Sequence, residues 1–181
     1  MKILVPLADG LEEIETVTCI DVLRRAGVNV TTAGLDKITI EGGHNINLEA
    51  DAKLSEIDGK EYDGIVLPGG IPGATNLRDN TEVVKLVKEL NYKGKLVAAI
   101  CAAPIVLEKA GVIENKSATS YPGFDEQMNS CNYSEERVIR DNNIITGRGP
   151  GVALEFALQI VSYLQGENKK EELKEAMLAK F

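Results

Sequence analysis

Cys101 is the residue whose type and position best suit nucleophilic chemistry. The apolar run Leu96–Ile100 leads directly into it, and Pro104, which suits the first position of a helix, follows three residues later. The pattern predicts a cysteine at a tight strand-to-helix turn, similar in mechanics to a nucleophile elbow although the G-x-S-x-G glycines are absent. Because a helix N-terminus stabilises an anion, we expect a lowered thiol pKa and a reactive thiolate. The alternative is a buried, inert cysteine.

Two glycine-containing loops could supply anion-binding groups. Gly69 and Gly70 follow the predicted strand Tyr62–Leu67, and their backbone N–H groups could form an oxyanion hole; a plain tight turn is the alternative. The loop 147–151, which contains Arg148, could hold an anion at the start of the next helix, although an arginine here is often structural. Neither loop has the spacing of a phosphate-binding loop, so nucleotide binding has little support.

Two further side chains could move a proton. Glu15 shares a helix face with Leu11, Thr18 and Val22, so its carboxyl could be buried with a raised pKa; the spacing alone favours a carboxyl at the edge of this stripe that reaches water. His44 is the only histidine, so it is the only imidazole that could serve a nucleophile. It lies in a Gly-Gly turn, where the simplest interpretation is an exposed histidine without a catalytic role.

The elements that must position these residues alternate between strands and helices. Predicted strands cover 2–7, 28–33, 62–67 and 96–100, and two hairpins join 38–40 to 46–48 and 138–140 to 144–146. Predicted helices run to Ala26 from a capping box at Asp9 and Glu12, and over 81–90, 104–110, 152–164 and 169–180. This alternation predicts one α/β domain over residues 1–181, with a mostly parallel sheet and helices on both faces. Ligands of such folds bind at the carboxyl ends of the strands, where all the loops above begin.

The composition narrows the classes of partner. The chain has 181 residues, 20 Lys+Arg and 28 Asp+Glu, so its formal net charge is 20 − 28 = −8. An acidic chain without a basic stripe argues against nucleic acid and membrane surfaces as partners. The single histidine and the cysteines at 19, 101 and 131 show no metal-ligand spacing, so we expect no metal and no other cofactor. The odd cysteine number and the absence of a signal sequence favour the reducing cytoplasm.

Four segments in order resemble the DJ-one/ThiJ/PfpI superfamily. They are Gly10–Glu15, Leu67–Gly70 with Gly73–Leu77, Ala98–Pro104, and Arg148–Gly151 with Glu155–Ala157. The resemblance implies a flavodoxin-like three-layer sandwich and a homodimer. By position it also implies that Cys101 is the nucleophile, that Glu15 bonds to its sulfur, and that Gly69 and Gly70 present N–H groups to it.

This resemblance implies a stress-response protein that acts on small reactive carbonyls through its cysteine, as a glyoxalase or deglycase. A redox sensor or chaperone oxidised at the same cysteine is the alternative, and an intracellular cysteine peptidase or amidase is the third. Ala102 stands where the peptidase-like branch has a histidine, and Tyr121 where a sensor-like branch has one. A tyrosine, with a pKa near ~10, is a poor base at neutral pH, so a Cys–His hydrolase is disfavoured. Whether Tyr121 or His44 replaces the missing histidine stays open.

Overall fold

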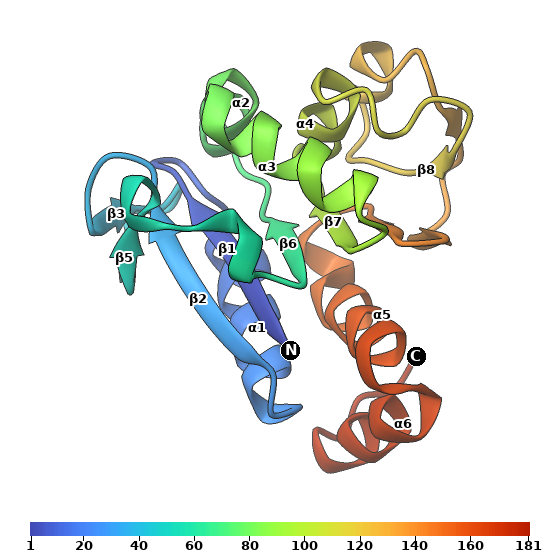
Figure 1. Ribbon diagram of the computed structural model, residues 1–181. Coiled ribbons are helices and arrows are strands. Elements are labelled where there is room, and N and C mark those ends of the chain that lie inside the picture. The colour runs from blue at the N-terminus through green and yellow to red at the C-terminus, as the bar shows by residue number, and fades with distance from the viewer.

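A seven-stranded sheet forms the centre of the computed structural model, which describes residues 1–181 (Figure 1). Its strand order is β10-β11-β7-β6-β1-β2-β5, and every neighbouring pair is parallel except β10 and β11. The strands are β1 (Lys2–Leu7), β2 (Asn29–Gly34), β5 (Ala52–Lys53), β6 (Gly64–Leu67), β7 (Leu96–Ile100), β10 (Val138–Asp141) and β11 (Ile144–Gly147). The side chains of β6 and β7 are buried along their whole length, as expected for strands covered on both faces.

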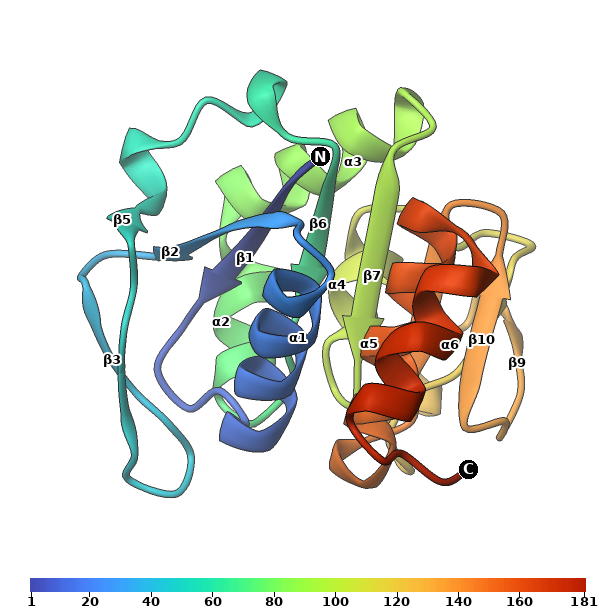
Figure 2. The same ribbon diagram turned by 90° about the horizontal axis from the view of Figure 1, so that it is seen from below.

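Helices cover both faces of this sheet, which confirms the predicted flavodoxin-like three-layer sandwich. Figure 2 shows α1 (Glu13–Arg25), α5 (Ala153–Gln165) and α6 (Glu167–Ala176) on one face. The other face carries α2 (Gly73–Asp79), α3 (Thr81–Tyr92) and α4 (Pro104–Lys109). One continuous cluster of 52 buried hydrophobic residues fills the space between the layers. No helix has the length and apolar character needed to cross a membrane.

Two small sheets lie outside the central one. The predicted hairpin around the Gly-Gly turn is present as β3 (Thr39–Glu41) and β4 (Asn47–Glu49), paired antiparallel. The second pair, β8 (Ser117–Ala118) and β9 (Asn132–Tyr133), was not predicted. Four short 3-10 turns complete the structure at Leu54–Glu56, Gly59–Glu61, Asp125–Gln127 and Pro150–Val152.

The predicted elements agree with the structure at most positions, with two corrections. The capping box at Asp9 is wrong: α1 begins at Glu13, and the N-cap is Glu12, whose carboxylate accepts the Glu15 N–H at 2.8 Å. The side chain of Asp9 instead pairs with Lys37 and accepts the Glu41 N–H. Helix α2 was not predicted, because its seven residues are too few to show the helical period of apolar positions.

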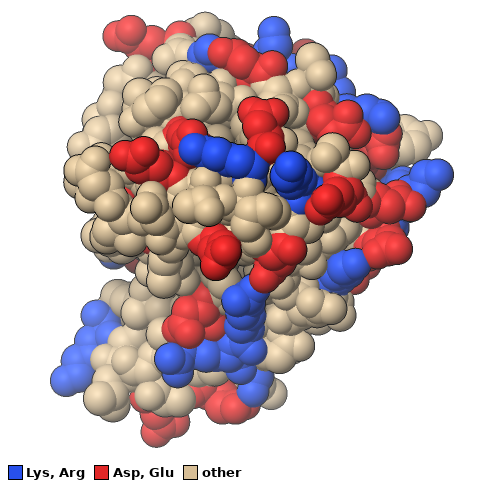
Figure 3. All heavy atoms as spheres, turned by 90° about the vertical axis from the view of Figure 1, so that its left-hand side faces the viewer, with Lys and Arg blue, Asp and Glu red and all other residues tan.

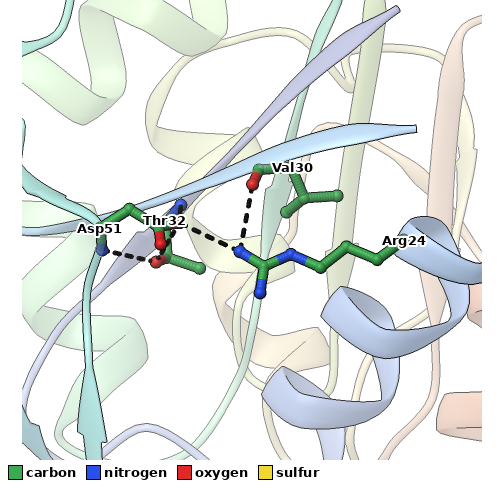
Figure 4. A network of polar contacts seen from close by, with 4 residues as sticks. All are labelled: Arg24, Val30, Thr32 and Asp51. Carbon is green, nitrogen blue, oxygen red and sulfur yellow. Dashed lines mark hydrogen bonds and ion pairs between the residues drawn. The ribbon is translucent and has the colours of Figure 1, made fainter. Parts of the chain in front are cut away.

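The β3–β4 hairpin is fixed at both ends. At its base, Asp51 Oδ2 accepts from the Thr32 N–H and hydroxyl and from Arg24, whose guanidinium also donates to the Val30 carbonyl (Figure 4). This network ties the segment after β4 to β2 and α1. The other end of the hairpin lies against the loop between β1 and α1, because the Gly10 N–H donates to Glu41 O and the Gly43 N–H to Leu11 O, both at 2.8 Å. The turn that carries His44 is therefore held against the start of α1.

Charges of both signs are interspersed on the side of the molecule that carries β3 and β5, as Figure 3 shows. Many of these side chains pair with each other, as Lys37 does with Asp9 and Arg24 with Asp51. Exposed pairs of this kind contribute little to stability, about 0–1 kcal/mol each.

Candidate active site

Cys101 lies in the turn between β7 and α4 and has a left-handed backbone conformation, with φ +62°. This conformation is uncommon for a residue with a side chain and costs about 1–3 kcal/mol, so the surrounding contacts must hold it. Its N–H donates to Gly147 O at 2.8 Å, and its carbonyl accepts the Tyr121 N–H at 2.9 Å. The turn therefore has the strained elbow geometry that the sequence predicted, and Cys101 is 8% exposed.

Backbone N–H groups surround the sulfur of Cys101, but the donors differ partly from those expected. The N–H groups of Gly70 and Ala102 point to the thiol and lower its pKa. The expected role of Gly69 is wrong, because its N–H donates to Glu15 Oε2 at 2.9 Å. The absence of a side chain at Gly69 also lets Cys101 and Glu15 approach its backbone closely, since a Cβ at this position would lie 2.6 Å from both Cys101 Cβ and Glu15 Oε2. Gly69 therefore positions the carboxyl, and Gly70 and Ala102 face the sulfur.

Glu15 is completely buried beside this thiol, so the interpretation that it lies at the edge of its stripe and reaches water is wrong. Burial raises the pKa of its carboxyl from 4.5 to about 7, and the Gly69 N–H and the Cys101 thiol offset only part of this effect. Its second oxygen, Oε1, is buried without a conventional hydrogen-bond partner. A protonated carboxyl is favoured in such surroundings, since no water solvates the charge.

The protonation of Glu15 and that of Cys101 depend on each other. Burial and the Glu15 charge raise the pKa of the Cys101 thiol to about 12. The expected lowering of the thiol pKa by a helix N-terminus is therefore wrong while Glu15 is ionised. The carboxyl loses its proton first, and the remaining proton can lie on sulfur or on Glu15. Thiolate character at Cys101 thus depends on transfer of this proton to Glu15.

An open depression of about 540 Å³ leads to the sulfur. It is lined by Glu12, Glu13, Ile14, His44, Ile46, Cys101, Tyr121 and Pro150. These residues come from the start of α1, the β3–β4 turn, the β7–α4 elbow, the loop before the 3-10 turn Asp125–Gln127 and the segment before α5. Three of the candidates that the sequence singled out, Cys101, Tyr121 and His44, therefore line one depression, at the edge of the sheet where ligands of this fold class bind.

Glu13 is a site residue that the sequence did not reveal. It is 5% exposed, and its two oxygens hold His44: Oε1 accepts the His44 N–H at 2.7 Å, and Oε2 lies 2.8 Å from Nδ1. These contacts lower the pKa of Glu13 against the effect of its burial, and Glu13 raises the pKa of His44. His44 is exposed, as expected for a turn, but it is paired. One side-chain oxygen each of Glu12 and Glu13 and a ring nitrogen of His44 lie within 4.8 Å of one another, and the contact between Nδ1 and Glu13 Oε2 uses one nitrogen of the ring.

The remaining candidates lie away from the sulfur or have structural contacts. Arg148 bonds to Glu135 and lines a neighbouring depression on the other side of Tyr121 and Pro150. Cys19 is buried inside α1, where burial raises its pKa, and Cys131 donates to the Met128 carbonyl. A further depression of about 550 Å³ at the ends of β1 and β2 contains Asp9, Asp36 and Lys37 but no nucleophile. The candidate chemistry is thus concentrated at Cys101.

The fold and the site define a class of protein: a flavodoxin-like sandwich with a cysteine in a strand-to-helix elbow and a buried glutamate beside it. Residues 1–163 match the model of the DJ-1/PfpI family. The chain belongs to this family, which confirms the resemblance seen in its motifs.

Three comparisons show how far this similarity extends. The chain is 41% identical to "Protein dj-1beta" of Drosophila melanogaster over 98% of its own length and 97% of that protein. It is 35% identical to "Glutathione-independent glyoxalase DJR-1.2" of Caenorhabditis elegans, over 94% and 91% of the two chains. The crystal structure of Drosophila melanogaster DJ-1beta superposes with a TM-score of 0.95 at 40% identity, covering 99% and 98% of the two chains.

Proposed function

We propose that this protein converts small dicarbonyl compounds such as methylglyoxal to hydroxy acids, with Cys101 as the nucleophile. The observation that carries this proposal is the coupled pair of Cys101 and Glu15, open to a depression and flanked by the N–H groups of Gly70 and Ala102. The relative from Caenorhabditis elegans that is named a glutathione-independent glyoxalase supports the choice of reaction. A stress-response role agrees with this chemistry.

The first step is addition of the thiol to the aldehyde. Ionised Glu15 takes the thiol proton as sulfur forms its bond to the aldehyde carbon, and the carbonyl electron pair moves onto oxygen. The N–H groups of Gly70 and Ala102 stabilise the negative charge that develops on this oxygen. Return of the proton from Glu15 to the oxygen gives a neutral hemithioacetal on Cys101.

The second step moves a proton along the substrate without an outside oxidant. Glu15 removes the hydrogen from the carbon bonded to sulfur, and the electron pair moves toward the neighbouring keto group, giving an enediolate. Protonation of the adjacent carbon yields a hydroxy thioester. One carbon is oxidised and its neighbour is reduced, so the redox balance is internal. Water then cleaves the thioester, releasing the hydroxy acid and the Cys101 thiol.

The test is the rate of methylglyoxal loss and lactate formation by the wild type, Cys101→Ala and Cys19→Ala. We expect Cys101→Ala to lose the activity and Cys19→Ala to keep it, since Cys19 lies in the core. Full turnover by Cys101→Ala would refute the proposal. Circular dichroism checks that both variants are folded.

Redox sensing at the same sulfur is the second candidate. Glu15 could donate a hydrogen bond to a sulfinate on Cys101, and Gly70 and Ala102 could donate two more. Mild peroxide should then oxidise Cys101 selectively, and mass spectrometry of the treated protein measures the oxidation of each cysteine. Equal oxidation of Cys101 and the half-buried Cys131 would count against this role.

We also propose that the protein is a homodimer. Ile14 and Val17 on α1 and Ile46 on the β3–β4 hairpin are large apolar side chains that are each about half exposed, at 59%, 47% and 54%. Exposed apolar patches of this kind are typical of interfaces. Light scattering after size-exclusion chromatography should give twice the chain mass, and Val17→Glu should give a monomer; a monomeric wild type would refute the assignment.

A further inference from the structure

His44 is held rigidly by contacts that do not depend on its own ring. The Gly43 N–H donates to Leu11 O, and the His44 N–H donates to Glu13 Oε1. Gly42 allows this approach, because a Cβ at position 42 would lie 2.2 Å from Glu13 Oε1. The hairpin turn and the start of α1 therefore fit together closely, and the imidazole extends from a fixed point.

The buried carboxylate of Glu13 also determines which ring nitrogen is free. Because Glu13 Oε2 accepts from Nδ1 at 2.8 Å, Nδ1 carries a hydrogen, and Nε2, which carries one as well when the ring is protonated, is left without a partner. The side chain of His44 is 73% exposed and borders the depression that contains Cys101. A buried carboxylate that orients an exposed imidazole is the arrangement by which many enzymes present the second nitrogen to a substrate.

The charges around His44 favour its protonated form. Glu13 and Glu12, both at the start of α1, raise its pKa, and no other basic side chain lines the depression. The titratable groups across the depression are Cys101 and Tyr121. With carboxylates on one wall and a thiol on the other, His44 is the single lining side chain that can carry a positive charge.

A dicarbonyl substrate needs such a group. Gly70 and Ala102 serve the oxygen nearest the sulfur, whereas the proton transfer between the two carbons places negative charge on the second, keto oxygen. A preorganised donor at that position stabilises the enediolate, and the carboxylates of Glu12 and Glu13 would repel it.

We propose that His44, oriented by Glu13, donates a hydrogen bond from Nε2 to the keto oxygen of the substrate bound to Cys101. The inference rests on the proposed carbonyl chemistry and adds a second oxyanion contact to it. Glu13 is the positioning residue, and it fixes both the orientation and the charge of the imidazole. The site would accordingly prefer dicarbonyls over simple aldehydes, which lack the second oxygen.

The test compares pH profiles of kcat/KM for methylglyoxal in the wild type, His44→Gln, His44→Arg and Glu13→Gln. His44→Gln should lose at least about tenfold, less than the ~10²–10³-fold effect of removing an oxyanion donor outright, because the glutamine amide keeps a neutral N–H donor without the charge. His44→Arg keeps the charge without titrating, so it should retain most activity and abolish the decline at high pH. Glu13→Gln should move that decline to lower pH, because Glu13 raises the pKa of His44.

Lys88→Gln, which removes an exposed cation from α3, is the control and should match the wild type.

Two results would overturn the inference: wild-type kcat/KM in His44→Gln, or an unchanged decline at high pH in His44→Arg. Alkylation of Cys101 by iodoacetamide separates this failure from failure of the proposed function. If Cys101→Ala is inactive while His44→Gln is alkylated normally and fully active, only the role of His44 is wrong. If Cys101→Ala is active, the proposed function itself is wrong.

Discussion

The buried carboxyl of Glu15 should make the stability of this protein depend on pH in a predictable way. Its pKa is about 7 in the folded protein against 4.5 for the unperturbed group. The folded state therefore holds the proton more tightly, and stability falls as the pH rises from about 4.5 to 7. The difference between 7 and 4.5 corresponds to about 3.5 kcal/mol, at ~1.4 kcal/mol per pKa unit.

Glu15→Gln removes this ionisation and keeps an oxygen that can accept the Gly69 N–H. Any cost of the buried amide is the same at every pH, so the comparison between two pH values isolates the carboxyl. From pH ~4 to pH ~8, the Tm of the variant relative to wild type should rise by about 7–14 °C, taking about 2–4 °C per kcal/mol for a chain of this size.

Differential scanning calorimetry at a series of pH values measures this difference directly. Glu114→Gln, which removes an exposed carboxylate, is the matched control and should show a much smaller change. A Tm difference between Glu15→Gln and wild type that stays constant with pH would refute the reasoning, because it would show that Glu15 is not buried as a titrating group.

Three further predictions follow from the site. Gly69→Ala should reduce both stability and activity, because its Cβ would lie 2.6 Å from Cys101 Cβ and Glu15 Oε2; an overpacked position of this kind costs about 1–3 kcal/mol, measurable by urea unfolding. The reactivity of Cys101 toward iodoacetamide should increase as the pH rises through about 7, when Glu15 becomes able to take the thiol proton; a flat profile between pH ~5 and ~8 would contradict the coupling. Cys19 should stay unlabelled in the folded protein at neutral pH, since it is 1% exposed and its pKa is raised by burial, whereas urea should expose it.

Local sequence patterns predicted the fold class and indicated Cys101 as the candidate nucleophile. Apolar runs that alternate with amphipathic stretches required a parallel sheet with helices on both faces, because each of these patterns has a single arrangement that buries its apolar side chains. The strand 96–100, followed by Cys101 and Pro104, required a cysteine at a strand-to-helix turn. The helical period placed Glu15 on a partly apolar stripe of α1, but only the structure shows that its carboxyl is buried.

The partners of the polar groups at the site depend on the tertiary structure. Gly69 and Gly70 are adjacent and identical in type, yet the N–H of Gly69 points to Glu15 and that of Gly70 to Cys101, a difference that two identical residues do not reveal in the sequence. Burial and the charge of Glu15, which is far away in the chain, raise the pKa of the Cys101 thiol and outweigh the N–H groups of Gly70 and Ala102, which lower it.

The contact between Glu13 and His44 was also beyond the reach of the sequence. Glu13 looks like an ordinary acidic residue in the first turn of a helix, and His44 like an exposed turn residue. Their pairing depends on the hairpin folding back onto the β1–α1 loop, an arrangement made by backbone hydrogen bonds that no side-chain pattern encodes. Local patterns thus specify which faces are buried, whereas the partners of a buried polar group depend on long-range packing.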